Sequence, residues 1–168
     1  MSIMYELVAY ASEFGAQVTE TLGGHSMTWN SGFYSHHLWR TDDKWLYGYS
    51  ERGDERIPTM WSTHDQIVYK WAASRIALDA REARELPQII LPAAIETLGA
   101  EWGLVQQTPL TGSLSLEGEQ IPMSLRTTFP RCRSLVEFSH LIRLPYDEVL
   151  ASYHAPDGSP RLGSFLAW

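Results

Sequence analysis

Residues 61–87 read WSTHDQIVYKWAASRIALDAREARELP, and this stretch decides how the rest of the chain is arranged. No proline or glycine interrupts it before Pro87, and its alanine, arginine, leucine and glutamate residues all favour helix. Ser62 or Thr63 can cap the start, because Asp65 and Gln66 follow them at capping-box spacing. The sequence therefore predicts one long central helix over residues 62–85.

This predicted helix is apolar on two sides. At about 100° per residue, Ile67, Trp71 and Leu78 share one line, which predicts that all three side chains are buried. Such a helix is expected to lie between a sheet and a second layer. Its charged end, residues 79–85, is expected to run out into solvent. The side nearly opposite the first line carries a second apolar set: Tyr69, Ala73, Ile76 and Ala80.

Short strands with alternating side chains precede the central helix. A first helix is predicted over residues 2–15, because Ser2 can cap it and Gly15 can end it. Residues 25–61 then alternate between aromatic or aliphatic and polar positions, with charged turns between the runs. This pattern predicts an antiparallel meander with aromatic faces. The expected strands cover residues 25–30, 33–39, 45–50 and 57–61.

The remainder of the chain continues the same mixture of strands and helices. A strand is predicted over residues 99–107, and two more are expected to pair across Gly118 and Glu119. Residues 134–142 are helical by spacing, and Pro145 opens a last short helix in its favoured position. The expected fold class is α+β. It is a mostly antiparallel sheet of short strands, with the long central helix and the C-terminal helices packed on it, in one domain over residues 1–168.

Composition narrows the class of partner. The 168 residues include 13 basic and 20 acidic ones, giving a net charge of −7. This balance argues against nucleic acid, which is bound through Lys and Arg, and suits a basic protein partner. The single Cys132 is typical of a reducing compartment. The N-terminus lacks the basic region of a signal peptide, and no apolar run approaches ~18 residues, so we expect a cytoplasmic protein without a membrane span.

The sequence contains no arrangement typical of catalysis or metal binding. His36 and His37 are adjacent, so on a strand they point to opposite faces and cannot chelate one ion together. The other histidines have no HxxxH or CxxC partner, and no G-x-S-x-G motif supplies a nucleophilic serine. Cys132 lies between Arg131 and Arg133, which could lower its pKa, but a lone thiol is usually inert. We therefore predict no catalytic, cofactor-binding or metal-binding residues.

Two charged turns are the candidate contact sites for a partner. The segment Glu51-Arg52-Gly53-Asp54-Glu55-Arg56 reads as a hairpin tip, in which Gly53 allows a tight turn. Its three carboxylates could pair with cations of a partner protein. They could equally form a solvated turn, or hold paired carboxylates of a small hydrolase. The second candidate is the Asp42–Asp43 turn.

Five segments resemble a known family. These are residues 135–141 (LVEFSHL), 147–149 (DEV), 152–153 (SY), 156–160 (PDGSP) and the aromatic strand and loop at 47–53 (YGYSERG). They look like the C-terminal signature and the aromatic strand of the immunity proteins of bacterial polymorphic toxins, similar to the immunity factor of tuberculosis necrotizing toxin. The order of elements along most of the chain also matches.

The resemblance implies a non-enzymatic inhibitor that needs no cofactor. Its partner would be a cognate toxin that hydrolyses NAD(P), bound as a 1:1 heterodimer by a protein that is otherwise monomeric. The antitoxin would block the toxin's active site. Two alternatives from the residues alone are a small-molecule-binding or scaffold domain that uses its aromatic sheet, and a small hydrolase that uses Glu51, Asp54 or a histidine.

Overall fold

A computed structural model describes residues 3–13, 15–20, 26–31, 34–52 and 54–167. The described α-helices are α1 Ile3–Glu13, α2 Asp65–Ala83, α3 Arg133–Ile142 and α4 Tyr146–His154, and the two 3-10 turns are η1 Ile95–Thr97 and η2 Gly163–Phe165. The strands are β1 Val18–Glu20, β2 Ser26–Ser31, β3 Tyr34–Arg40, β4 Trp45–Glu51, β5 Ile57–Ser62, β6 Gln88–Ile89, β7 Trp102–Thr108, β8 Thr111–Leu116, β9 Glu119–Gln120, β10 Met123–Arg126 and β11 Leu166–Ala167.

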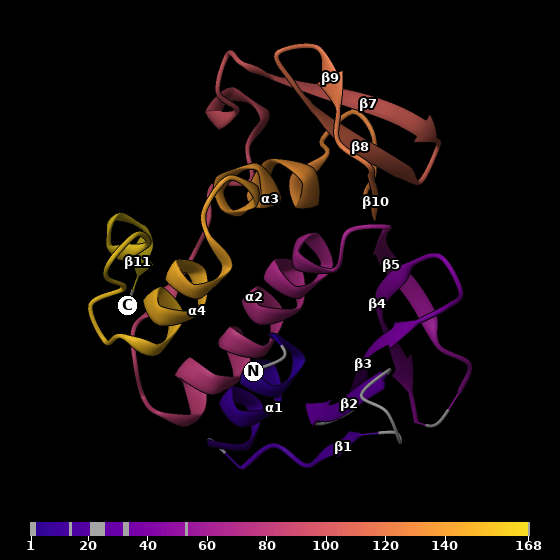
Figure 1. The fold of residues 1–168 in the computed structure, drawn as a ribbon. Coiled ribbons are helices and arrows are strands. Elements are labelled where there is room, and N and C mark those ends of the chain that lie inside the picture. Colours follow the sequence, from indigo (N-terminus) through magenta and orange to yellow (C-terminus); the bar gives the residue numbers. More distant parts are fainter. Residues whose placement is uncertain (1–2, 14, 21–25, 32–33, 53, 168) are drawn as a thin grey trace.

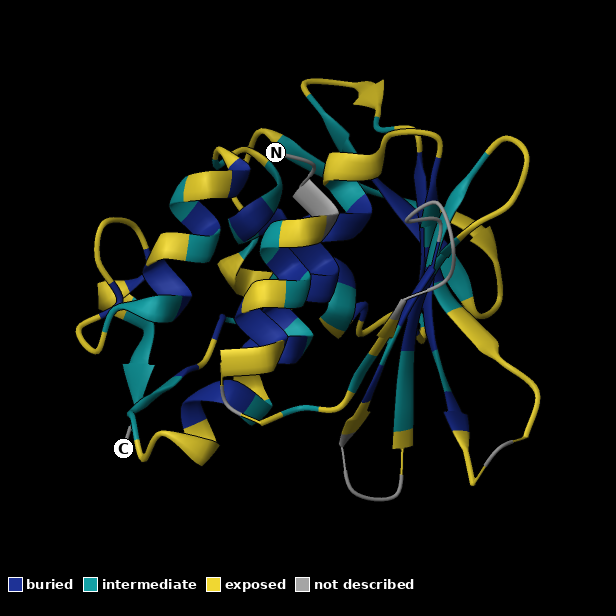
Figure 2. Ribbon diagram, turned by 60° about the horizontal axis from the view of Figure 1, so that its bottom comes forward, coloured by how far each residue is buried: buried dark blue, intermediate teal, exposed yellow. Residues whose placement is uncertain are grey.

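Nine of the described strands form one sheet with the helices on one face (Figure 1), and β6 and β11 form a second, two-stranded sheet. The order of the nine-stranded sheet is β1-β2-β3-β4-β5-β10-β8-β7, with β9 paired to β8, and all its described pairs are antiparallel. The predicted α+β class is therefore confirmed. Strand β10 lies between β5 and β8, so it joins the N-terminal meander to the C-terminal hairpin. Figure 2 shows that the buried parts of the helices face one another and the sheet.

The central helix begins later than predicted. Ser62 remains in the sheet, because it pairs with Trp45 of β4 and Met123 of β10. Its hydroxyl donates to the Pro122 carbonyl at 2.6 Å and accepts from the His64 N–H at 3.0 Å. The helix starts at Asp65, and the N-cap is His64, which makes no side-chain capping bond. The predicted capping by Ser62 or Thr63 is wrong, because sheet pairing takes the serine first.

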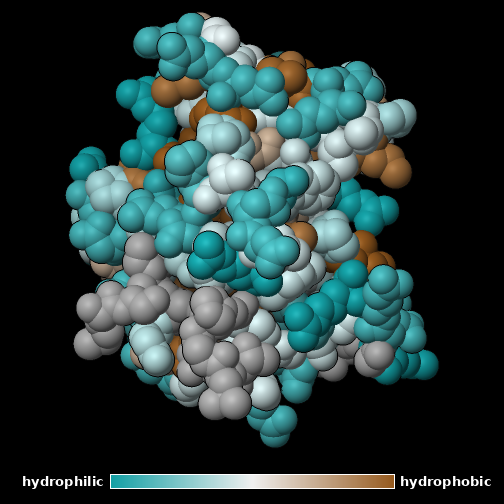
Figure 3. All heavy atoms as spheres, turned by 45° about the vertical axis from the view of Figure 1, so that its right-hand side comes forward, coloured by the Kyte–Doolittle hydropathy of each residue, from teal (hydrophilic) through white to brown (hydrophobic). Residues whose placement is uncertain are grey.

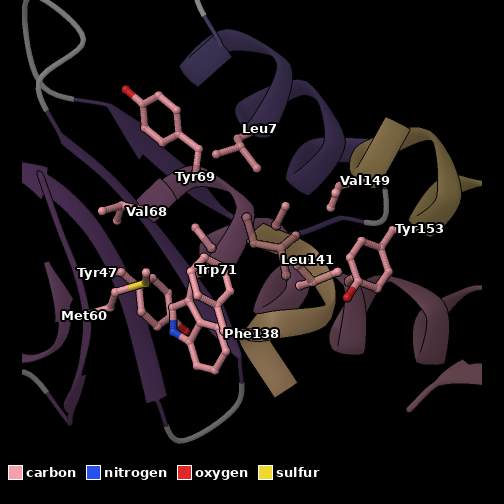
Figure 4. Close-up of a cluster of buried hydrophobic side chains, with 14 of the residues drawn as sticks. Leu7, Tyr47, Met60, Val68, Tyr69, Trp71, Phe138, Leu141, Val149 and Tyr153 are labelled. Carbon is pink, nitrogen blue, oxygen red and sulfur yellow. The ribbon is translucent and has the colours of Figure 1, made fainter. Parts of the chain in front are cut away.

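Both sides of α2 are buried, as the two apolar lines predict. Figure 4 shows Val68 toward Met60 and Tyr47 of the sheet, with Leu141, Val149 and Tyr153 gathered elsewhere around the helix. Trp71 is 4% exposed and meets Phe138 edge-on, with ring centroids 5.6 Å apart.

The prediction for the first apolar line is only partly correct. Ile67 is half-buried against the core, whereas Leu78 is 41% exposed and its predicted burial is wrong. In the second half of α2 the buried positions are Ile76, Ala77, Ala80 and Arg81. At ~100° per residue, Leu78 lies on the opposite side from this set.

Arg81 contradicts the expectation of a solvent-exposed helix end, since it is 1% exposed. Its guanidinium donates to four backbone carbonyls: those of Pro87 at 2.6 Å, Tyr153 at 2.9 Å, Ala155 at 2.8 Å and Pro156 at 3.0 Å. An arginine offers five N–H donors, so it can satisfy several carbonyls at once. Three of these carbonyls lie at the end of α4 or just after it, and one lies in the segment after α2. Strand β6 follows Pro87, one of these carbonyl acceptors, directly along the chain, and the last strand, β11, pairs with β6. The end of α2 therefore anchors the C-terminal segment.

Candidate functional site

The two predicted contact turns lie at opposite ends of the meander. The 41–44 turn joins β3 to β4, and the tip at residues 51–56 joins β4 to β5. Strand β4 separates them over its seven residues, which at ~3.3 Å per residue is roughly 20 Å. The structure therefore does not bring the two turns together, and a narrow cleft in a partner can take only one of them.

The 41–44 turn is closed by its own contacts. The backbone N–H of Thr41 donates to the Lys44 carbonyl at 2.9 Å, and the Thr41 hydroxyl donates to the same oxygen at 3.2 Å. Asp42 and Asp43 are exposed, and Asp43 lies 3.9 Å from the Lys44 ammonium. An exposed pair of this kind contributes little stability, so both carboxylates remain open to a partner.

The tip presents its carboxylates outward. Glu51, Asp54 and Glu55 are exposed, and none of their side chains has an ion pair or hydrogen bond with the part of the chain that the structure describes. The backbone N–H of Asp54 donates to the Glu51 carbonyl at 2.9 Å and so closes the turn. Arg52 is exposed at its side, and Gly53 lies outside the described residues.

Arg56 links the tip to the sheet. Its guanidinium lies over the ring of Trp39 at 5.7 Å from the ring centroid, within the range of a cation–π contact. Near this contact, Gly48 leaves the sheet surface free of a side chain. A Cβ at Gly48 would collide with the backbone of Ile57. The tip and the sheet surface beside it therefore form one continuous region.

The face of the sheet away from the helices carries a half-buried apolar row. Trp39 of β3, Leu46 of β4 and Trp61 of β5 are direct register partners, so their side chains share one face. None of the three packs against the hydrophobic core, and the helices lie on the other side of the sheet (Figure 1). We call Trp39, Leu46 and Trp61 the outer row. Tryptophan, together with a nearby arginine, is the composition of protein interfaces rather than of ordinary surface.

Polar contacts hold the outer row in position. His37 lies between Thr28 and Ser50, with Nδ1 2.9 Å from Thr28 Oγ1 and Nε2 2.8 Å from Ser50 Oγ. Trp39 meets the His37 ring edge-on, with centroids 6.4 Å apart. Burial, with Arg56 nearby, lowers the pKa of His37 to about 4, so the ring is neutral near pH 7. A neutral, doubly hydrogen-bonded ring is a fixed support for the tryptophan.

His36 points to the opposite face, as predicted for adjacent strand residues. Its ring stacks on Trp29 with centroids 5.1 Å apart, and Nδ1 lies 2.9 Å from the Tyr47 hydroxyl. Burial, with Arg75 nearby, lowers its pKa to about 4. The two histidines therefore serve different faces of one strand and share no ligand site.

The described residues include neither a metal-binding cluster nor an exposed thiol. Among the residues that the structure describes, no group of three His, Cys, Asp or Glu side chains could hold a metal ion. Cys132 is buried, and burial raises the pKa of its thiol, so the flanking arginines do not activate it.

The described helices include none long and apolar enough to cross a bilayer. Figure 3 shows a mainly hydrophilic surface with small separate hydrophobic patches on the side it presents.

Sequence reasoning identified both turns but not the outer row. The alternation in β3 placed Trp39 on one face of a strand, yet its alignment with Leu46 and Trp61 depends on register. That register shifts at an irregularity between Tyr47 and Gly48, which no local sequence pattern announces. The charged composition of residues 51–56 was the only signal pointing to this end of the sheet.

Two comparisons with known proteins match most of the chain. A family model described as immunity protein 61 matches residues 10–161. The solved structure of Rv3902c from M. tuberculosis matches with a TM-score of 0.74 at 17% sequence identity, covering 97% of this chain and 93% of that chain. At that identity the likeness is one of fold. No curated protein matches the sequence.

Proposed function

Because the chain belongs to the immunity protein 61 family, we propose that it is an antitoxin that binds a cognate NAD(P)-hydrolysing toxin and blocks its active site. The family match over residues 10–161 is the observation that carries this proposal. Rv3902c, which shares the fold, is the immunity factor of tuberculosis necrotizing toxin. In this proposal residues 1–168 form one immunity domain, which acts in the cytoplasm as a monomer that binds one toxin and catalyses nothing itself.

The tip at residues 51–56 is the proposed blocking element. A toxin site that binds the pyrophosphate of NAD(P) needs cations, and carboxylates can pair with those cations in place of the substrate. Glu51, Asp54 and Glu55 are exposed and have no described partner of their own, so no internal contact is lost on binding. Arg52, Gly53 and Arg56 complete the tip in this proposal. The net charge of −7 also favours rapid association with a cationic site.

The outer row is the proposed anchor beside the tip. Hot spots of binding energy are enriched in tryptophan and arginine at well-packed positions. Trp39 and Trp61 flank Leu46 on the uncovered face, and Arg56 joins Trp39 to the tip. Asp42 and Asp43, roughly 20 Å from the tip by strand length, are proposed to touch the rim of the toxin rather than its active site.

The test replaces Glu51, Asp54 and Glu55 with alanine together. Inhibition of the toxin's NAD hydrolysis is titrated with each variant at low and high salt. Truncating one partner of a desolvated charge pair costs ~2–5 kcal/mol, so we expect inhibition to weaken by at least ~30-fold and to lose its salt dependence. The Asp42→Ala, Asp43→Ala double variant is the matched control and should change inhibition only slightly.

Three outcomes would contradict the proposal at different levels. If the triple variant inhibits as tightly as the parent, with the same response to salt, the interface lies elsewhere. If the purified chain consumes NAD when incubated alone, it is an enzyme and the inhibitor assignment is wrong. Capture of a toxin without loss of its activity would leave binding intact but exclude active-site blockade.

A further inference from the structure

A second surface, far along the chain from the tip, combines unpaired arginines with a cavity. A hollow of about 520 Å³ lies where β10 leads into α3, and Arg126, Arg131 and Arg133 line it together with Phe129 and Thr127. None of the three arginines has an ion pair or hydrogen bond from its side chain within the described part of the chain. Three free guanidinium groups in a protein of net charge −7 need an explanation.

Arginines elsewhere in the described structure are occupied. Arg75 pairs with Glu137 at 3.2 Å, Arg143 pairs with Glu101 at 3.5 Å, and Arg161 pairs with Glu148. Arg81 is satisfied by backbone carbonyls, and Arg56 lies on Trp39. The cluster at residues 126–133 is therefore distinguished by its lack of ion pairs within the described residues. Its guanidinium groups are free to receive an external anion.

A threonine hydroxyl in the hollow is available to a ligand. The Thr127 residue is 7% exposed and lines the cavity. Its backbone N–H donates to the Leu110 carbonyl at 3.0 Å, whereas its hydroxyl has no hydrogen-bond partner among the described residues and is not one of their buried unsatisfied groups. The hydroxyl is therefore open to the hollow, where it can donate to a bound acceptor oxygen.

The backbone adds two more donors at the same place. The first backbone bonds of α3 run from the N–H groups of Leu135 and Val136 to the Cys132 carbonyl, at 2.9 and 3.1 Å. The N–H groups of Arg133 and Ser134 precede these bonds, as the first N–H groups of any helix do. Both residues line the hollow. A helix start with free N–H groups favours a negative group in front of it.

An adjoining hollow supplies an apolar wall. It measures about 590 Å³ and is lined by residues 90–96 together with the same Arg131 and Arg133. Ile90 and Ile95 are exposed there, at 61% and 45%. Figure 1 shows the segment carrying η1 beside α3, and the two elements are in contact. Arg131 and Arg133 thus line both hollows, the second of which also carries Glu96, and each hollow is in the size range of ligand sites.

We propose that this surface binds a phosphate ester of nucleotide size. Its phosphate groups lie against Arg126, Arg131 and Arg133 and accept from Thr127, and its organic part occupies the hollow at residues 90–96. Guanidinium groups match phosphate oxygens in a two-bond geometry, and these three have no ion pair within the described residues. The proposal does not rest on inhibition of a toxin, since neither the tip nor the outer row takes part.

The experiment measures binding of four probes by isothermal titration calorimetry: ADP, inorganic pyrophosphate, adenosine and a peptide of twelve glutamates. We expect ADP and pyrophosphate to bind one per chain, ADP more tightly, and adenosine not to bind. The Arg131→Gln, Arg133→Gln double variant should weaken ADP by at least about tenfold, because charge-assisted bonds to phosphate are lost. Arg84→Gln, a loss of one positive charge away from the hollow, should leave the affinity unchanged.

Thr127→Val separates a binding role from a structural one. Because the Thr127 hydroxyl has no described hydrogen-bond partner and is not a buried unsatisfied group, replacing it by a methyl group of the same shape should leave the melting temperature of the free protein nearly unchanged. The same change should weaken ADP severalfold. A variant that is both less stable and weaker in binding would indicate damage to the fold and would remove the support that this hydroxyl gives.

Three results would overturn the proposal. Adenosine binding as tightly as ADP would exclude the phosphate, and ADP binding unaffected by the arginine double variant would exclude the hollow. Absence of ADP binding at low salt would reject the site outright. Binding of the glutamate peptide to the same arginines without ADP binding would assign the surface to an acidic protein segment instead.

Discussion

The two faces of the meander are built from the same strands but do different work. The inner face carries Trp29, His36 and Tyr47, which stack on one another under the helices. The outer face carries His37 and the outer row, which no described helix covers. Because side chains alternate along a strand, one of any two consecutive residues points to the inner face and the other to the outer face. Stability and recognition can therefore be altered separately, by choosing one residue or the next.

The largest expected effect lies in the inner core. Trp71→Ala should lower the free energy of unfolding by ~3–5 kcal/mol, since it removes a buried indole packed on Phe138. Leu78→Ala on the same helix is the matched control, because Leu78 is exposed and should cost ~1 kcal/mol or less. Urea unfolding of both variants measures the difference. Equal losses would show that burial does not separate the two positions.

The next largest effect tests the outer face. Trp61→Ala should weaken toxin binding by about 2 kcal/mol, or ~30-fold, if it is a hot spot, with a loss of stability of ~1 kcal/mol or less. Trp45→Ala reverses the pattern, because Trp45 packs edge-on against Tyr69 of α2 on the inner side, 5.2 Å between centroids. Titration against the toxin and thermal melting are needed for both variants. Unchanged affinity for Trp61→Ala would remove the outer row from the interface.

The histidines give a pH test of the two faces. Folding lowers the pKa of both His36 and His37 to about 4, so below the unfolded value of 6.5 only the unfolded chain takes up these protons. Stability is therefore full at neutral pH and falls as pH drops from 6.5 toward 4. At pH 5.5 the loss is on the order of 1 kcal/mol for each histidine.

Urea midpoints between pH 7 and pH 5.5 measure this slope. His36→Gln and His37→Gln should each remove about half of it, whatever their effect on absolute stability. Such a result means that His37, on the outer face, is shielded from water to the same extent as His36, on the core side. A slope that responds only to His36→Gln would show that His37 titrates normally, as an exposed histidine does.

The smallest expected effect concerns the link between tip and sheet. Arg56→Gln should reduce stability by about 0.5–1 kcal/mol, the usual strength of an exposed cation–π contact. A double-mutant cycle with Trp39→Leu isolates that contact. A coupling energy of zero would mean that Arg56 does not hold the tip against the outer row, and the two surfaces would then act independently.

Local patterns predicted the elements better than their assembly. The spacing of Leu135, Phe138 and Leu141 predicts α3, and Pro145 marks the start of α4 within one residue. The position of β10 between β5 and β8 could not be predicted, because it pairs Leu125 with Met60, far apart in sequence. Arg81 was misjudged for the same reason. Its carbonyl partners at residues 153–156 are brought to it by packing and not by local sequence.

The candidate surfaces follow the same division. The charges of the tip are visible in six consecutive residues, so the turn could be found from sequence. The outer row requires the register of three strands. The arginine cluster was noticed only as a possible activator of Cys132, whereas the thiol is buried and the arginines face a hollow. The sequence does not show whether a charged residue has an oppositely charged neighbour in the folded protein.

The insertion of β10 has a consequence for synthesis of the chain on the ribosome. Strand β5 ends at Ser62 and its partner begins at Met123, about 60 residues later. At 5–20 residues per second the nascent chain therefore carries an open strand edge for roughly 3–12 s. An open edge can pair with another chain. A chain stalled in this interval would present the edge to neighbouring chains. The strand that completes the sheet, β10, therefore also covers an edge through which the nascent chain could aggregate during translation.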